Sequence, residues 1–117
     1  MGVATKAYCE VFSRKILPVA RAYVASVLIN EYNISQLRAA KLLGMKQPAV
    51  NYLVRGKRRV KYMDLLRSVP LLKDVLDDIV EEVKLGNIFN PCDFCKRLTS
   101  NSALLKQVLD ALDEKLR

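Results

Sequence analysis

The feature that most constrains this chain is the separation of charge along it. Eight basic residues and no acidic residue lie between Tyr32 and Met63. The whole chain has 20 Lys and Arg residues against 12 Asp and Glu residues, so its formal net charge of +8 belongs to this one segment. Such a bias is typical of a surface that binds a polyanion, because each basic side chain that neutralises a phosphate releases condensed counterions. The alternative is a basic surface that serves only solubility.

The same segment has the pattern of two short helices joined by a tight turn. Ser35 is a good N-cap for the first helix, since its hydroxyl can accept a hydrogen bond from a free backbone N–H. Gly44 can take the left-handed conformation that ends a helix, and Pro48 fits the first turn of a second helix that begins near Gln47. We expect Gly56 to end this second helix. The side chains expected to face inward are Leu37, Ala39, Ala40, Leu42 and Leu43 on the first helix, and Ala49, Val50 and Leu53 on the second.

The remaining side chains of the second helix are polar and are expected to point outward. They are Lys46, Gln47, Asn51, Tyr52 and Arg55. A helix fits the major groove of DNA, and Gln and Asn are the side chains that pair bidentately with adenine. A helical hairpin with no role in DNA binding, which uses Ala and Gly only for packing, is the alternative.

Residues 35–59, SQLRAAKLLGMKQPAVNYLVRGKRR, resemble the helix-turn-helix of the phage repressor and Cro type, also called the XRE family. The resemblance implies a helix-turn-helix over residues 35–56 and a recognition helix of about 47–55 in the major groove. It assigns base reading to Lys46, Gln47, Pro48, Asn51 and Tyr52. It assigns phosphate binding to Gln36, Arg55, Lys57, Arg58 and Arg59. The sequence departs from the family at Lys46, which replaces the usual Ser or Thr cap, and at Pro48, which replaces a polar base-reading residue.

Most of the chain also resembles a group of archaeal predicted transcriptional regulators. The resemblance rests on Cys9-Glu10-Val11, on ILPVARAYVASVL, on the two-helix segment and on a late CxxC. It implies a sequence-specific transcription regulator that binds double-stranded DNA, with the transcription machinery as a further partner. The alternative function is a non-specific DNA-binding protein or a transcription-coupled adaptor.

The three cysteines are Cys9, Cys92 and Cys95. The CxxC spacing lets two sulfurs reach one metal ion, with Cys9 or a second copy of the motif completing the ligands. The pair could instead be a redox dithiol, or ordinary buried cysteines. The archaeal resemblance favours convergence of all three cysteines. Thiolate ligands suit an iron–sulfur cluster or zinc equally.

The hydrophobic pattern predicts an all-α fold of five or more helices. We expect residues 1–86 to form a DNA-binding domain and residues 87–117 to form a C-terminal extension. Helices are expected within 4–32, with a break at Pro18, and over 61–68, 71–85 and 103–116. Residues 87–102, which hold the CxxC, are expected to be loop-rich. The apolar stripe of the last helix needs either its own core or a second copy of the chain, and we expect a homodimer.

The sequence predicts neither catalysis nor membrane insertion. The chain has no His, so imidazole catalysis within it is excluded, and we expect no enzyme activity. A thiol oxidoreductase is the alternative from another class, but the strand–helix alternation of a thioredoxin-like unit is missing. The chain has no apolar run of 18 residues and no signal-peptide pattern at its start, so we expect a cytoplasmic protein.

Overall fold

The computed structural model of the protein describes residues 10–56 and 59–116, without the side chains of residues 113–116. Within these ranges the chain is helical and has no strand, so the predicted all-α class is confirmed for the described part. The elements are η1 (Phe12–Ile16), α2 (Leu17–Asn30), α3 (Gln36–Leu43), α4 (Gln47–Arg55), α5 (Arg59–Ser68), α6 (Pro70–Lys84), α7 (Pro91–Thr99) and α8 (Ser102–Leu116). None of the described helices is both long enough and apolar enough to cross a bilayer.

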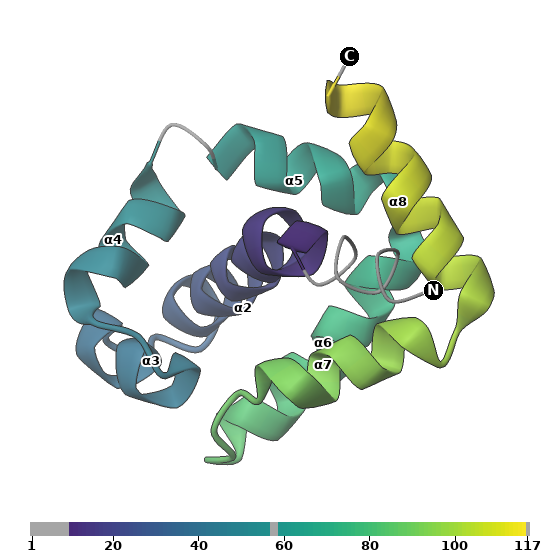
Figure 1. The fold of residues 1–117 in the computed structure, drawn as a ribbon. Coiled ribbons are helices and arrows are strands. Elements are labelled where there is room, and N and C mark those ends of the chain that lie inside the picture. Colours follow the sequence, from purple (N-terminus) through teal and green to yellow (C-terminus); the bar gives the residue numbers. More distant parts are fainter. Residues whose placement is uncertain (1–9, 57–58, 117) are drawn as a thin grey trace.

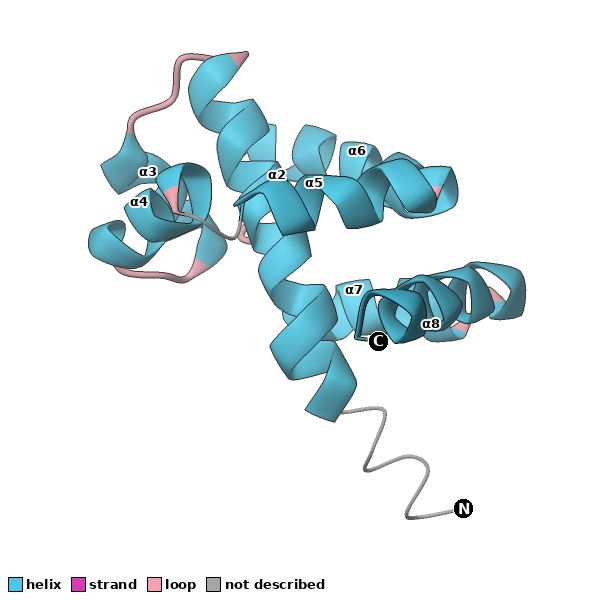
Figure 2. Cartoon of the chain, turned by 90° about the horizontal axis from the view of Figure 1, so that it is seen from above, coloured by secondary structure: helices cyan, strands magenta, loops and turns pink. Residues whose placement is uncertain are grey.

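Helix α2 is the centre of the fold. Helices α3 and α4 lie on one side of it and α5 to α8 lie on the other (Figure 1, Figure 2). The sequence of α2 is apolar almost all round, which is the pattern of a helix that is buried on more than one face. Its buried side chains are Val19, Ala20, Ala22, Val24, Ala25, Ser26 and Leu28. The core therefore lies along α2, and α3 and α4 both pack on this central helix.

The sequence predicted a break or a kink at Pro18, and the structure shows a change of helix type one residue before it and no interruption of the helix. Residues 10–30 are helical throughout, but η1 is a π-helical stretch in which the N–H of Leu17 donates to the carbonyl of Phe12. A proline in a regular α-helix has no N–H to donate and clashes with the carbonyl of the residue four positions earlier. The wider π-turn directly before Pro18 accommodates the ring without ending the helix.

The largest error of the sequence-based prediction concerns residues 87–102. They are not loop-rich, because α7 occupies Pro91–Thr99. Asn90 caps this helix and Pro91 is its first residue, a position where a missing N–H has no cost. The helix buries Phe94 and Leu98, which stand four residues apart and therefore on one face.

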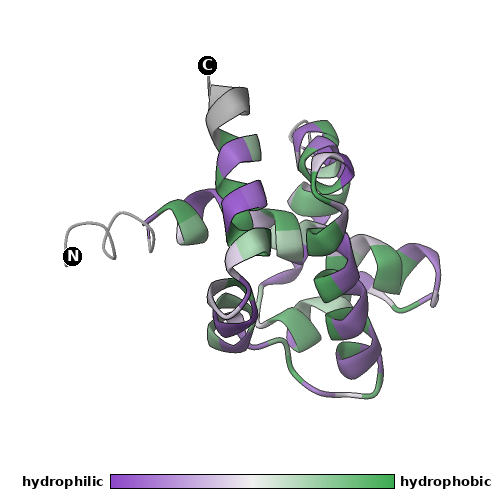
Figure 3. Ribbon diagram, turned by 90° about the vertical axis from the view of Figure 1, so that its right-hand side faces the viewer, coloured by the Kyte–Doolittle hydropathy of each residue, from purple (hydrophilic) through white to green (hydrophobic). Residues whose placement is uncertain are grey.

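The C-terminal helices share the core of the rest of the chain. The ring of Phe94 lies 5.6 Å from that of Phe12 and 6.2 Å from that of Phe89, measured between centroids. Asn101 caps α8 by accepting a hydrogen bond from the N–H of Leu104 at 3.1 Å. Hydrophilic and hydrophobic residues alternate along α8, the ribbon that ends at C in Figure 3. Its residues Leu104 and Val108 are fully buried, so this part of the stripe packs on its own chain.

Candidate nucleic-acid interface

Helix α3 and the turn after it have the local structure that their residues dictate. The hydroxyl of Ser35 accepts a hydrogen bond from the N–H of Arg38 at 3.1 Å and caps the helix. Gly44 has a φ of 66°, and the N–H of Met45 donates to the carbonyl of Ala40 at 2.8 Å. These bonds satisfy carbonyls that the last turn of a helix leaves without partners. Leu37 was expected in the core but is 53% exposed, because no described element covers its side of α3.

Helix α4 is fixed by its apolar underside. Val50 is fully buried, and Leu53 and Val54 are only 7% and 8% exposed. Helix α4 packs against both α2 and α3. Ala49 was expected to face inward, but it is exposed. It precedes Val50 by one residue, which turns it by about 100° round the helix and away from α2.

The polar face of α4, which we define as Lys46, Gln47, Asn51, Tyr52 and Arg55, is exposed along its whole length. Pro48 is exposed beside it. Lys46 occupies the N-cap position without a side-chain cap, as its chemistry predicts. All five predicted base-reading residues therefore lie at the surface of one helix or at its first turn.

One hydrogen bond connects this face to the start of α3. The Nε2 of Gln36 donates to the Oδ1 of Asn51 at 3.3 Å, between residues that are 15 positions apart. The bond holds the amide plane of Asn51 and brings Gln36, a predicted phosphate-binding residue, next to the polar face of α4. Sequence spacing alone does not reveal this pairing. Arg59 begins α5 and is exposed, whereas Lys57 and Arg58 lie outside the described residues.

The described cations of this region have no counterion among the described residues. Six basic residues between Tyr32 and Met63 are described, and all are exposed and form no ion pair with a described residue: Arg38, Lys41, Lys46, Arg55, Arg59 and Lys61. Arg38 and Lys41 did not belong to the predicted site, and their exposure on α3 extends the positive surface. Three acidic residues of α6, in contrast, have cationic partners. Asp77 pairs with Lys73, Glu81 with Lys84 and Glu82 with Arg97.

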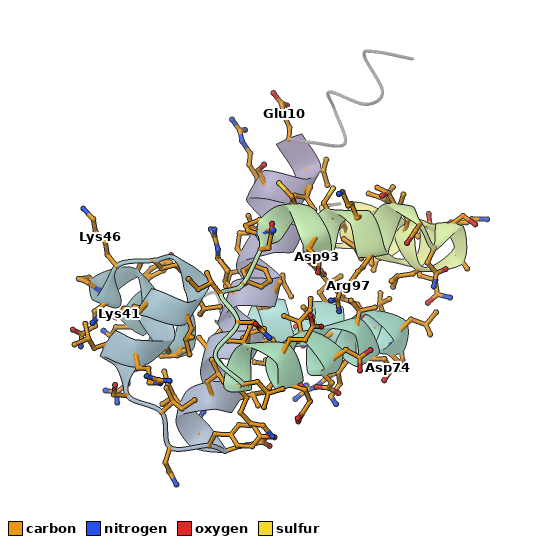
Figure 4. All side chains as sticks on the ribbon, turned by 90° about the horizontal axis from the view of Figure 1, so that it is seen from below. Glu10, Lys41, Lys46, Asp74, Asp93 and Arg97 are labelled. Carbon is orange, nitrogen blue, oxygen red and sulfur yellow. The ribbon has the colours of Figure 1, made fainter. Side chains whose placement is uncertain are left out.

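Charge of the two signs is also separated in space. Figure 4 shows Lys41 and Lys46 at one end of the molecule and Asp74, on α6, toward the other end. The end with Lys41 and Lys46 therefore presents cations that pair with no described residue around an exposed polar helix, and Asp74 of α6 lies away from it. This arrangement lets a polyanion approach α4 without meeting like charge.

The CxxC pair lies in the first turn of α7. Cys92 is exposed, whereas Cys95 is partly buried against the hydrophobic core. No group of three or more potential metal ligands is assembled among the residues that the structure describes. The two sulfurs supply half of a tetrahedral ligand set, so the described donors do not complete a metal centre. Cys9 lies outside the described residues, and its convergence with the pair stays a prediction.

The segment between α6 and α7, residues 85–90, connects the first turn of α7 to α3. The N–H of Phe89 donates to the carbonyl of Leu42 at 2.8 Å, and the next residue, Asn90, caps α7. Arg97 of α7 donates to both carboxylate oxygens of Glu82 on α6, at 2.8 and 2.6 Å, and also pairs with Asp93 at 3.0 Å. Figure 4 shows Asp93 and Arg97 directed toward each other at the junction of these helices. The region that holds the cysteines is thus bonded to the first helix of the candidate interface.

No protein-family model, curated protein or solved structure matches the chain. The charge and shape of the surface around α4 are therefore the features that bear on function.

Proposed function

We propose that this protein is a sequence-specific DNA-binding transcription regulator that inserts α4 into the major groove. The observation that carries the proposal is the polar face of α4, which is exposed above a buried apolar underside, in a region whose six described cations pair with no described residue. A helix with its side chains is about 10–12 Å wide and the major groove of B-DNA is about 12 Å wide. Gly44 and residues 45–46 join α3 to α4, which supports a helix-turn-helix of the repressor and Cro type.

In this proposal Asn51 is the principal base-reading residue. Its amide can donate to N7 and accept from N6 of adenine, the bidentate contact that distinguishes adenine in the major groove. The hydrogen bond from Gln36 occupies one lone pair of Oδ1 and leaves the second free, because a carbonyl oxygen has two. Gln36 therefore orients Asn51 before DNA arrives and lowers the entropy lost on binding. Gln47 is the second polar residue that can read a base, and Pro48 offers only apolar contact, for example to a thymine methyl group.

The unpaired cations bind the phosphate backbone on both sides of the groove. Arg55 and Arg59 end α4 and begin α5, and Arg38 and Lys41 lie on α3. Contacts of this kind position the protein and carry no sequence information of their own. Two copies of the chain, bound to half-sites about one helical turn apart, would be the usual arrangement for such a protein. The homodimer remains a prediction, and sedimentation that shows a monomer at tens of micromolar would contradict it.

The experiment begins with selection of duplexes from a random pool, followed by anisotropy measurements on the selected duplex and on a shuffled duplex of equal composition. Replacing Asn51 by Ala should cost about 1–3 kcal/mol on the selected duplex, which is roughly 5- to 150-fold, and little on the shuffled one. Replacing Arg59 by Ala should weaken both complexes alike and reduce the salt slope by about one. Lys106→Ala, an exposed cation on α8, is the matched control and should leave both affinities unchanged.

Two results would refute this assignment. Equal losses for Asn51→Ala on both duplexes would remove base reading from α4. A wild-type preference of less than about tenfold for the selected duplex would favour the alternative, a non-specific DNA-binding protein or transcription-coupled adaptor, since specific sites are typically bound at least 10³-fold more tightly.

A further inference from the structure

We infer that Cys92 and Cys95 form a dithiol that exchanges with small disulfides, and that closing it disturbs α3 through residues 89 and 90. The inference concerns the regulation of the candidate interface, so its effect on DNA rests on the proposed function. Its chemical and structural parts stand without that function. Three observations carry it: the unequal exposure of the two sulfurs, the capped helical turn that contains them, and the hydrogen bond from Phe89 to Leu42.

The two cysteines are suited to different steps of thiol exchange. Cys92 is exposed and can meet a disulfide from solution, whereas Cys95 is partly buried against the hydrophobic core and is less accessible to it. Cys92 is therefore the sulfur placed for the first attack, and Cys95, three residues further along the same helix, is placed for the second.

The reaction with a small disulfide such as oxidised glutathione balances as follows. Cys92 loses its proton and attacks one sulfur, which forms a mixed disulfide and releases one thiolate that takes up a proton. Cys95 then loses its proton and attacks the sulfur of Cys92, which forms the intramolecular disulfide and releases the second thiol. The protein pair is oxidised by two electrons, and the small disulfide is reduced to two thiols.

Closing this disulfide must distort the first turn of α7. Side chains three apart on a helix have Cβ atoms about 5–6 Å apart, whereas a disulfide needs about 3.5–4.5 Å. The two Cβ atoms must therefore come roughly 1–2 Å closer together, which tightens or unwinds the turn. The same turn is held by Asn90, whose Oδ1 accepts from the N–H of Cys92 at 2.9 Å and of Asp93 at 3.3 Å. Movement of Cys92 therefore pulls on Asn90.

The distortion reaches α3 by a short covalent and hydrogen-bonded path. Asn90 follows Phe89, whose N–H is bonded to the carbonyl of Leu42 at 2.8 Å. Leu42 lies in the last turn of α3, where carbonyls lack partners within the helix, so Phe89 supplies the bond that this carbonyl would otherwise lose. The buried ring of Phe89 also lies 6.2 Å from the ring of Phe94, measured between centroids. Phe94 belongs to α7, the helix that the disulfide would strain. Gly44, two residues after Leu42, forms the turn that positions α4 relative to α3.

The test uses the full chain with Cys9→Ser, so that Cys92 and Cys95 are the only thiols. The protein is equilibrated in glutathione buffers of graded ratio, and mass spectrometry follows the loss of two hydrogen atoms within the peptide that contains both cysteines. Hydrogen exchange at the amide of Phe89 is measured in the reduced and oxidised states, together with anisotropy on the selected duplex. The matched control carries Cys92→Ser in the same background and keeps the fold of the reduced protein.

We expect the pair to close, the Phe89 amide to exchange at least about tenfold faster, and affinity for the selected duplex to fall at least fivefold, with no such change in the control. Failure of the pair to close in oxidised glutathione would overturn the dithiol. So would stoichiometric zinc or iron in the wild-type protein that protects the pair and is lost on Cys92→Ser. A closed pair with unchanged Phe89 exchange would overturn the coupling. If the reduced protein binds no duplex, the proposed function fails, and the exchange rate of Phe89 still decides this inference.

Discussion

Replacing Phe94 by Ala tests whether residues 87–117 belong to the same cooperative unit as residues 1–86. Phe94 is fully buried on α7, and its ring lies 5.6 Å from the ring of Phe12 in the first helical stretch. Removing it leaves a cavity between the two ends of the chain. The sequence predicted a boundary near residue 86, and a buried aromatic contact across that boundary predicts that the two parts unfold together.

The size of the effect follows from the burial of this ring. Truncating a fully buried Phe to Ala costs about 3–5 kcal/mol, because both transfer free energy and cavity terms are lost. A domain of this size has a total free energy of unfolding of roughly 6–18 kcal/mol, so the variant should stay folded but lose a large share of its stability. At about 2.1 cal/mol/K of unfolding entropy per residue, a loss of about 4 kcal/mol lowers Tm by roughly 15 °C.

The assay compares two probes of urea unfolding. All five Tyr residues precede residue 87, so tyrosine fluorescence reports only on the part of the chain that the substitution does not touch. Circular dichroism reports on all helices. We expect both midpoints to fall together, on the order of 2 M for Phe94→Ala. Ile88→Ala, at a side chain that is 69% exposed, is the control and should change stability by less than about 0.5 kcal/mol. An unchanged tyrosine midpoint beside a shifted circular-dichroism midpoint would refute the shared core.

Three further predictions concern single residues. Ser35→Ala should cost about 1 kcal/mol of stability, since the N–H of Arg38 loses its acceptor; Ser13→Ala, at an exposed position of η1, is the control, and equal effects in thermal unfolding would speak against the cap. Gly44→Ala should cost about 1–2 kcal/mol although a Cβ there would meet no atom within 4 Å, because the strain comes from the φ of 66°, and Gly44→Asn should cost less in the same assay. Burial and then the hydrogen bond to Asp77 raise the pKa of Tyr23 to about 12, so the neutral phenol contributes stability below pH 10 that is lost as pH rises from 10 to 12. Phenolate absorbance should show one late-titrating tyrosine that Tyr23→Phe removes, and its persistence in that variant would contradict the assignment.

The features that depend on close neighbours in the chain could be predicted from the sequence. A cap or a turn is decided by hydrogen bonds over three to five residues, and the cap at Ser35 and the turn at Gly44 are confirmed. The order of the charged residues is fixed by the sequence, so the basic segment could be predicted without the fold. The exposure of the polar face of α4 followed from helical periodicity, because Val50 and Leu53 define its buried side.

Only the tertiary structure decided which faces are covered and which distant residues meet. Leu37 is exposed and α7 is a helix, because burial depends on the partner that a surface finds and not on the residue alone. The bond from Gln36 to Asn51 joins residues of different helices, and that from Phe89 to Leu42 spans nearly half the chain. Periodicity carries no information about such pairs, since they arise only when α2 sets the positions of the helices that pack on it. The sequence therefore determined the charge and the local turns, and the packing around α2 determined the surface that those residues form.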